Sequence, residues 1–127
     1  MIICIVDDDL SIHASIKQYI GEIGPIYKFI SFTDGTEMYQ YLLTHITNAV
    51  LLPSIIFLDL NMPVMDGFSF LEKYDGLRKI IALKPEIYVI STISHRSTIQ
   101  MIEGNRNVNG FIAKPFEKDT LLSIFNK

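Results

Sequence analysis

Residues 55–67 read IIFLDLNMPVMDG, and this stretch decides the fold. Its first four residues are apolar, as expected for a strand that is buried on both faces of a sheet. The run stops on Asp59, whose carboxylate is costly to bury as a charge unless a cation meets it. Pro63 and the pair Asp66-Gly67 then predict a turn before the next helix. Asp59 is therefore either part of an ordinary turn or the centre of a site.

The same succession of apolar run, polar turn and amphipathic segment occurs five times along the chain. After the first run, Ile12, Ile16 and Ile20 fall at helical spacing, with Ser11 as the expected N-cap. Strands are predicted at residues 1–6, 26–32, 55–58, 87–91 and 110–113, each followed by a helix. Alternating strands and helices of this length predict an α/β, doubly wound parallel sheet with helices on both faces.

Composition limits the class of protein. The 127 residues suit one domain, and 49% hydrophobic residues without low-complexity tracts argue against disorder. The 14 acidic and 11 basic residues form no basic stripe for nucleic acid. No apolar run approaches the ~20 residues that span a bilayer, and the single cysteine is typical of a reducing compartment. We therefore expect one cytoplasmic domain over residues 1–127 that binds neither nucleic acid nor membrane.

Polar residues follow four of the five predicted strands. Because parallel strands place their carboxyl ends at one edge, where ligands bind, these side chains should gather there. They are Asp7 and Asp8 after the first strand, Asp59 at the third, Ser91 and Thr92 at the fourth, and Lys114 at the fifth. Three carboxylates at close range need neutralising. The lysine supplies one positive charge, and a divalent cation such as Mg²⁺ supplies two.

This donor set also predicts a chemistry. Mg²⁺ binds few protein oxygens and keeps several waters, which leaves room for a phosphate oxygen, and Mn²⁺ would accept the same ligands. An aspartate can attack phosphorus as a nucleophile to give an acyl phosphate. The metal ion, the lysine and a hydroxyl group would share the charge on the transferring oxygens. We therefore expect a phosphoryl group at this edge of the sheet.

Four fragments carry a family resemblance, namely CIVDDD at residues 4–9, FLDLNMPVMDG at 57–67, VIST at 89–92 and GFIAKPF at 110–116. In this order and spacing they resemble the receiver domain of two-component response regulators, over essentially the whole chain. The resemblance implies a stand-alone signalling domain similar to chemotaxis regulators, not a classical enzyme. It also implies a flavodoxin-like (βα)5 fold with strand order 2-1-3-4-5.

The resemblance implies a role for each matching residue. The implied metal ligands are Asp8 directly, Asp7 largely through water, the phosphoacceptor Asp59 and the backbone carbonyl of Asn61. The implied switch comprises the Ser91 hydroxyl, the phosphate-binding Lys114 and the ring of Phe111, which follows the hydroxyl inward. A cis bond between Lys114 and Pro115 is also implied.

The implied partners are a sensor histidine kinase or a histidine phosphotransfer protein, and a downstream protein target. Phosphorylation would add charge and shift a two-state equilibrium that is read on a distant face. No output domain is expected in this chain, so the output would be a protein contact. A phosphorylation-dependent homodimer on the side of the fourth helix stays open, as do the pathway and the cognate kinase.

The chain departs from the family in four places. The count back from Lys114 fits Thr92 as the switch hydroxyl, whereas the strand pattern favours Ser91. The apolar Ile93 flanks the path of the hydrolytic water, and we expect it to lengthen the phosphoryl lifetime. EGNRNVNG at residues 103–110 replaces a small, alanine-rich turn and predicts an unusual partner surface. The last helix is short, which predicts a piece of a longer protein.

Other interpretations compete with this one. Acids before a helix often only complement its dipole, Asn61 lies in a stretch of turn residues, and Phe111 could simply be core. The three histidines read as surface residues without metal spacing; they are His13, His45 and His95. A haloacid-dehalogenase-type phosphatase would need an aspartate at position 61. A receiver scaffold that takes no phosphoryl group is the remaining alternative.

Overall fold

The computed structural model describes residues 1–24, 27–92 and 95–125, and it confirms the predicted alternation of strands and helices. The strands are β1 (Ile2–Val6), β2 (Lys28–Phe32), β3 (Ile55–Asp59), β4 (Glu86–Ser91) and β5 (Gly110–Ala113). The helices are α1 (Leu10–Gly21), α2 (Gly35–Thr44), α3 (Gly67–Asp75), α4 (Arg96–Glu103) and α5 (Lys118–Leu122), followed by the 3-10 turn η1 (Ser123–Phe125).

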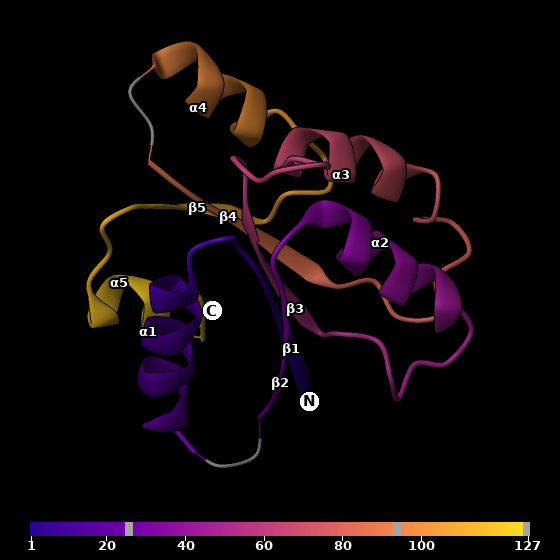
Figure 1. Cartoon of the computed structure of the whole chain (residues 1–127), viewed down its shortest axis with the longest axis horizontal. Coiled ribbons are helices and arrows are strands. Elements are labelled where there is room, and N and C mark those ends of the chain that lie inside the picture. Colours follow the sequence, from indigo (N-terminus) through magenta and orange to yellow (C-terminus); the bar gives the residue numbers. More distant parts are fainter. Residues whose placement is uncertain (25–26, 93–94, 126–127) are drawn as a thin grey trace.

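The five strands form one parallel sheet in the order β2-β1-β3-β4-β5, as predicted (Figure 1). The register pairs Val6 with Leu58 and Asp59 with Ile90. The carboxyl ends of β1, β3 and β4 therefore lie next to one another. In an open parallel sheet, this edge is where ligands bind.

Two apolar layers enclose the sheet, because successive side chains of a strand point to opposite faces. Figure 1 shows α1 and α5 on one side and α2 and α3 on the other. In β1, Ile3 and Ile5 pack toward α1 and α5, whereas Cys4 and Val6 pack toward α2 and α3. Cys4 is fully buried, and this burial raises the pKa of its thiol to about 12. The central strands are thus anchored on both faces, which fixes the edge where they end.

Aspartates begin the first three helices. Asp9, Asp34 and Asp66 are the N-caps of α1, α2 and α3, and their side chains accept hydrogen bonds from backbone N–H groups of the first turn. The prediction of Ser11 as the first cap was wrong, since the Ser11 backbone N–H and its hydroxyl both donate to Asp9. Each of these turns lies at the carboxyl end of a strand, so the caps shape the loops around the site.

The boundaries of some elements differ from the prediction by one or two residues. β2 begins at Lys28, β3 includes Asp59, and β4 begins at Glu86. Residues 25–26, where the second strand was predicted to start, lie outside the described residues. Met101 of α4 is 62% exposed although it follows the apolar spacing, whereas its neighbour Ile102 is buried. Tertiary packing, which the local pattern does not contain, decides these positions.

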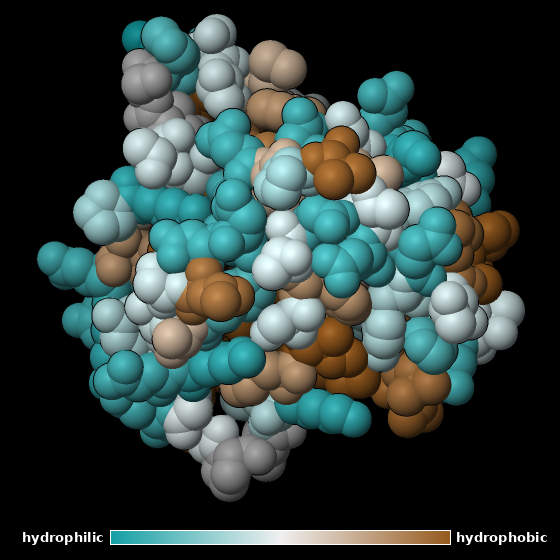
Figure 2. All heavy atoms as spheres, viewed as in Figure 1, coloured by the Kyte–Doolittle hydropathy of each residue, from teal (hydrophilic) through white to brown (hydrophobic). Residues whose placement is uncertain are grey.

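The surface carries few large hydrophobic side chains. Figure 2 shows hydrophilic residues over most of one face and hydrophobic ones gathered toward the edge where α2 and the connections after α2 and α3 lie. The exposed hydrophobic residues of those segments are Leu43, Val50 and Ile80. None of the described helices has the length and apolar content needed to cross a membrane.

Candidate functional site

The turn between β1 and α1 presents two carboxylates of different exposure. Asp7 is buried, and its Oδ1 accepts a hydrogen bond from the Asp9 backbone N–H at 2.9 Å. The Asp7 backbone N–H donates to the carbonyl of Phe32 in β2 at 3.1 Å. Asp8 is exposed. One carboxylate is therefore held inside the edge of the sheet, and the next faces outward from the same turn.

Asp59 is the last residue of β3 and is only 4% exposed. The loop behind it is tightly packed, because a Cβ atom on Gly67 would lie 2.5 Å from the Asp59 carbonyl oxygen. The Gly67 backbone N–H also donates to the Leu60 carbonyl at 3.0 Å. Val64 in the same loop has a φ of 65°, in the left-handed region that a β-branched residue rarely adopts. The loop that holds Asp59 at the edge of the sheet is therefore tightly packed and contains backbone strain at Val64.

Lys114 reaches the two buried carboxylates from the end of β5. Its Nζ donates to Asp7 Oδ2 at 2.7 Å and lies 3.4 Å from Asp59 Oδ1. The lysine side chain is 16% exposed, and the Lys114-Pro115 bond is cis. One ammonium group therefore bridges carboxylates from two neighbouring strands.

The charges at this edge change the pKa values of two of these groups. Burial and the negative charge of Asp7 raise the pKa of Asp59 to about 6, against the opposing effects of Lys114 and the Asn61 backbone N–H. Burial disfavours the charged form of Lys114, but the hydrogen bond to Asp7 and the charge of Asp59 outweigh it and raise the pKa of the lysine. At neutral pH the site keeps an excess of negative charge, which favours binding of a cation.

Three carboxylates converge closely enough to share a metal ion. One oxygen from each of Asp7, Asp8 and Asp59 lies within 4.8 Å of the others. Hard divalent cations such as Mg²⁺ prefer such oxygen ligands and keep several bound waters. Because Asp8 is exposed, water can reach a cation bound here. Asn61 is exposed two residues after Asp59, where its backbone N–H is close to the Asp59 carboxylate. The donor set therefore fits Mg²⁺ or Mn²⁺.

The two hydroxyl residues at the end of β4 differ in their surroundings. Ser91 is buried, and among the residues that the structure describes its hydroxyl makes one long hydrogen bond, 3.4 Å, to the Thr92 carbonyl, whereas Thr92 is exposed. Both residues line a cavity of about 220 Å³ together with Asn61. Space therefore exists beside Ser91 on the side of the loop that follows β3. Ile93 lies outside the described residues, so its predicted effect is not addressed by the structure.

Phe111 lies in β5, outside the carboxylate cluster. Its partly buried ring packs against Leu60, Val89 and Ile102, and it lines a hollow of about 330 Å³ below α4. The ring is therefore neither exposed nor fully embedded in the core.

His13 was predicted to lie at the surface, and this prediction was wrong. The ring is buried, 4% exposed, and its Nε2 atom lies 2.7 Å from the backbone carbonyl oxygen of Asp7. The spacing of His13, Ile16 and Ile20 on one helix face could have indicated burial. His45 is half-buried and His95 is exposed.

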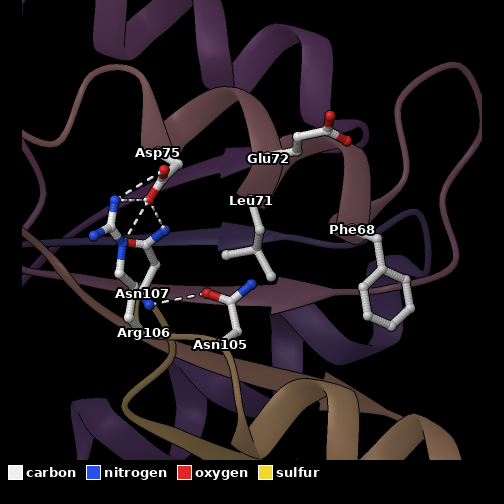
Figure 3. A pocket seen from close by; sticks show the side chains of 7 residues that line it. All are labelled: Phe68, Leu71, Glu72, Asp75, Asn105, Arg106 and Asn107. Carbon is white, nitrogen blue, oxygen red and sulfur yellow. Dashed lines mark hydrogen bonds and ion pairs between the residues drawn. The ribbon is translucent and has the colours of Figure 1, made fainter.

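A further surface hollow, of about 380 Å³, lies between α3 and the turn before β5 (Figure 3). Here Arg106 donates to both carboxylate oxygens of Asp75 at 3.0 Å, and Asn107 Nδ2 donates to Asp75 Oδ1 at 3.0 Å. These hydrogen bonds, that from Asn107 first, lower the pKa of Asp75. The unusual segment at residues 103–110 is thus tied to the C-terminal end of α3, away from Asp59.

The family model for the response regulator receiver domain matches residues 3–126. The chain belongs to the response regulator receiver family. Receiver domains are signalling domains of two-component systems. Response regulator Rre1 of Synechocystis sp. is 28% identical over 121 residues, which cover 94% of this chain and 48% of that protein. The receiver described here thus spans about half the length of this curated relative.

Solved receiver structures share the fold of this receiver domain. A two-component response regulator from Cytophaga hutchinsonii matches with a TM-score of 0.81 at 20% identity, covering 98% of this chain and 93% of that one. Chemotaxis protein CheY4 of Vibrio cholerae matches with a TM-score of 0.74 at 24% identity, covering 98% and 95%. The fold is therefore shared with receivers that are only 20% and 24% identical to this chain.

Proposed function

We propose that this receiver domain takes up a phosphoryl group on Asp59 in a reaction that depends on Mg²⁺ or Mn²⁺. The observation that carries the proposal is the position of the Asp59 carboxylate, which ends a buried strand with two further carboxylates within 4.8 Å and an ammonium group at 3.4 Å. Three converging carboxylates repel one another, so a turn with a purely structural role would not favour this arrangement. Phosphoryl transfer needs this combination of nucleophile, metal ligands and fixed positive charge.

In the proposed reaction, an Asp59 carboxylate oxygen forms a bond to phosphorus. The P–N bond of a phosphohistidine or the P–O bond of acetyl phosphate breaks at the same time. The bonding electron pair leaves with the imidazole, which then takes up a proton, or with acetate. A bound Mg²⁺ would supply charge stabilisation for the phosphoryl oxygens. The phosphodonor in the cell would be a histidine kinase or a histidine phosphotransfer protein.

The residues around Asp59 have distinct proposed roles. Asp8 would bind the cation directly and Asp7 largely through water, and the backbone carbonyl of Asn61 would complete the protein ligands. Lys114 would hold a phosphoryl oxygen, which its position between Asp7 and Asp59 supports. Because the pKa of Asp59 is about 6, its carboxylate is mostly ionised at neutral pH and is available as a nucleophile.

Phosphorylation would be read out through Ser91 and Phe111. The Ser91 hydroxyl is buried beside the loop after β3, and its one hydrogen bond to the described residues is long, so it can turn to a phosphoryl oxygen at little cost. Thr92 is exposed and is the weaker candidate. Phe111 is partly buried beside a hollow next to α4, and its ring would follow the hydroxyl inward. The changed surface of α4, β5 and α5 would then bind a downstream protein or a second copy of this domain.

The decisive test is the intact mass after incubation with acetyl phosphate, with and without Mg²⁺. The proposal expects a phosphoryl-sized gain in the native chain that requires the metal ion and is lost in Asp59→Ala. Asp119→Ala, which removes an exposed carboxylate of α5, is the matched control and should keep the gain. Mg²⁺ binding without any adduct would favour a scaffold that takes no phosphoryl group. Turnover of a generic phosphatase substrate would instead favour a hydrolase.

A further inference from the structure

His13 is a buried imidazole directly behind the acidic turn. It lies on α1, one turn past the helix start, with 4% of its surface exposed. Its Nε2 atom lies 2.7 Å from the backbone carbonyl oxygen of Asp7. A carbonyl oxygen can only accept a hydrogen bond, so Nε2 carries the proton and donates it. The second ring nitrogen, Nδ1, is buried and has no hydrogen-bond partner among the described residues.

The hydrogen bond from His13 completes the fixation of Asp7. The Asp7 backbone N–H donates to Phe32, its Oδ1 accepts from the Asp9 backbone, and its Oδ2 accepts from Lys114. The carbonyl oxygen is the remaining polar group, and His13 is the side chain that holds it. Every hydrogen-bonding group of this buried residue is therefore engaged.

The Asp7 carbonyl belongs to the peptide plane that joins Asp7 to Asp8. Because the peptide unit is planar, holding its oxygen also fixes the direction in which the chain continues to Asp8. Asp8 is exposed, so packing around its side chain does little to restrict it. The orientation of its carboxylate toward Asp7 and Asp59 thus depends on the backbone that His13 holds.

The imidazole at position 13 does more than fill space in the core. The neighbouring buried positions on the same helix face are the apolar Ile16 and Ile20. An apolar side chain at position 13 would fill the space and avoid the unpaired ring nitrogen, but it would leave the Asp7 carbonyl oxygen without this donor. What the imidazole adds is one donor, aimed at the backbone between two carboxylates.

We propose that His13 is a positioning residue for the cation site, whose Nε2–H group fixes the Asp7–Asp8 peptide plane so that Asp8 reaches the metal ion. The inference rests on the proposed function, since it requires that the three carboxylates bind Mg²⁺. Residues that orient metal ligands through a hydrogen bond typically change metal affinity by about 10–100-fold when removed. Here the hydrogen bond acts through the backbone, so we expect the lower end of that range.

The test compares Mg²⁺ affinity in the whole chain by isothermal titration calorimetry at pH 7.5. His13→Leu removes the donor, and its affinity should fall about tenfold. His13→Gln places an amide N–H near the position of Nε2 and should restore affinity to within about threefold of the native chain. Ile20→Val, on the same buried face of α1, is the control for loss of packing and should bind Mg²⁺ like the native chain.

A second measurement covers the case in which His13→Leu does not fold. Long-range ¹H–¹⁵N spectra of the native chain report which imidazole nitrogen carries the proton, and the inference requires the Nε2–H tautomer. A proton on Nδ1 alone would overturn it. Equal Mg²⁺ affinity in the native chain and His13→Leu, or an equal loss in Ile20→Val, would overturn it while leaving the proposed function intact. A native chain that binds no Mg²⁺ would overturn both.

Discussion

The Lys114 ammonium group lies 2.7 Å from a carboxylate oxygen of Asp7, although 107 residues separate the two in the chain. This contact joins the ends of β5 and β1, which are not neighbours in the sheet. The pair is mostly buried, with side-chain exposures of 16% and 2%. Removing one partner of such a pair leaves an uncompensated charge. The lysine is therefore a structural cation as well as a proposed phosphate ligand.

Lys114→Met should lower the free energy of unfolding by about 3 kcal/mol at pH 7.5, because Asp7 and Asp59 lose their shared cation. Urea denaturation measures this change. Lys118→Met is the matched control, because Lys118 pairs with Glu22 at the surface, and such pairs contribute little. A native-like stability of Lys114→Met would show that the carboxylates do not depend on this lysine.

Asp59→Asn should stabilise the fold at neutral pH. The pKa of Asp59 is about 6 in the folded chain and 3.8 for an ordinary aspartate, so the folded state binds this proton more tightly. Between these values stability falls as pH rises, because the unfolded state ionises first. Removing the charge should raise the free energy of unfolding by about 2–3 kcal/mol at pH 7.5 without divalent cation.

The same comparison at low pH provides the check. Below the ordinary aspartate pKa, Asp59 is mostly uncharged in the folded and in the unfolded native chain. The gain in the free energy of unfolding of Asp59→Asn should therefore largely disappear. Added Mg²⁺ should stabilise the native chain more than the variant, since a ligand that binds the folded state raises stability. A gain that is independent of pH would mean that the burial of charge at Asp59 is not its cause. Urea titrations at pH 7.5 and pH 3.5 would separate these results.

Val64→Gly should raise the free energy of unfolding by about 1 kcal/mol. Val64 has a φ of 65° and is 89% exposed, so glycine removes backbone strain and loses little packing. Val64→Ala keeps a Cβ atom and should show little gain, which makes it the matched control. Thermal unfolding followed by circular dichroism is sufficient. Destabilisation by glycine would indicate that the valine side chain makes contacts that outweigh the strain.

Asn107→Ala should destabilise the fold more than Arg106→Ala, although both residues bind Asp75. Asn107 is buried and its amide hydrogen bond is shielded, so we expect a cost of about 1.5 kcal/mol. The Arg106–Asp75 pair is exposed to water, where ion pairs contribute little. Urea denaturation of the two single variants and the double variant measures both costs. The reverse order would show that the ion pair, and not the amide, ties the turn to α3.

Ser91→Ala should block the response to phosphorylation and still allow the phosphoryl group to form. Ser91 is the buried hydroxyl beside the acceptor loop, whereas Thr92 is exposed, so Thr92→Ala is the control that should respond normally. Hydrogen exchange across β5, with and without acetyl phosphate, reports the change around Phe111. A normal response in Ser91→Ala together with a lost response in Thr92→Ala would assign the switch to Thr92.

The sequence was sufficient for the sheet because its signal is strong and local. Each strand is a short apolar run that ends at a polar residue, and helical spacing separates the runs, so strand number and direction follow from general rules. The start of β4 was less well predicted, because Glu86 is polar, yet it pairs with Ile55 of β3 in the sheet. Residue type makes Ser11 an acceptable cap, but Asp9, which lies closer to the end of β1, is the N-cap of α1.

Part of the candidate site could be predicted because its residues follow the predicted strands. Asp7, Asp8, Asp59, Ser91 and Lys114 all lie at strand ends, which parallel topology gathers at one edge. His13 was missed because residue type favours the surface for histidine, and its burial depends on a backbone carbonyl that needs a donor. No sequence pattern reports an unpaired carbonyl. The hydrogen bond between His13 and the Asp7 carbonyl is therefore seen only in the structure.

Cys4 lies fully buried in β1, between β2 and β3, and is the single thiol of the chain. Its raised pKa keeps it protonated, and only the thiolate reacts with alkylating reagents. Such a reagent can modify the native chain only when β1 opens, so the alkylation rate measures how often the central sheet opens. A cysteine introduced at the surface would react far sooner. Fluorophores can therefore be attached at chosen positions without replacing the native thiol.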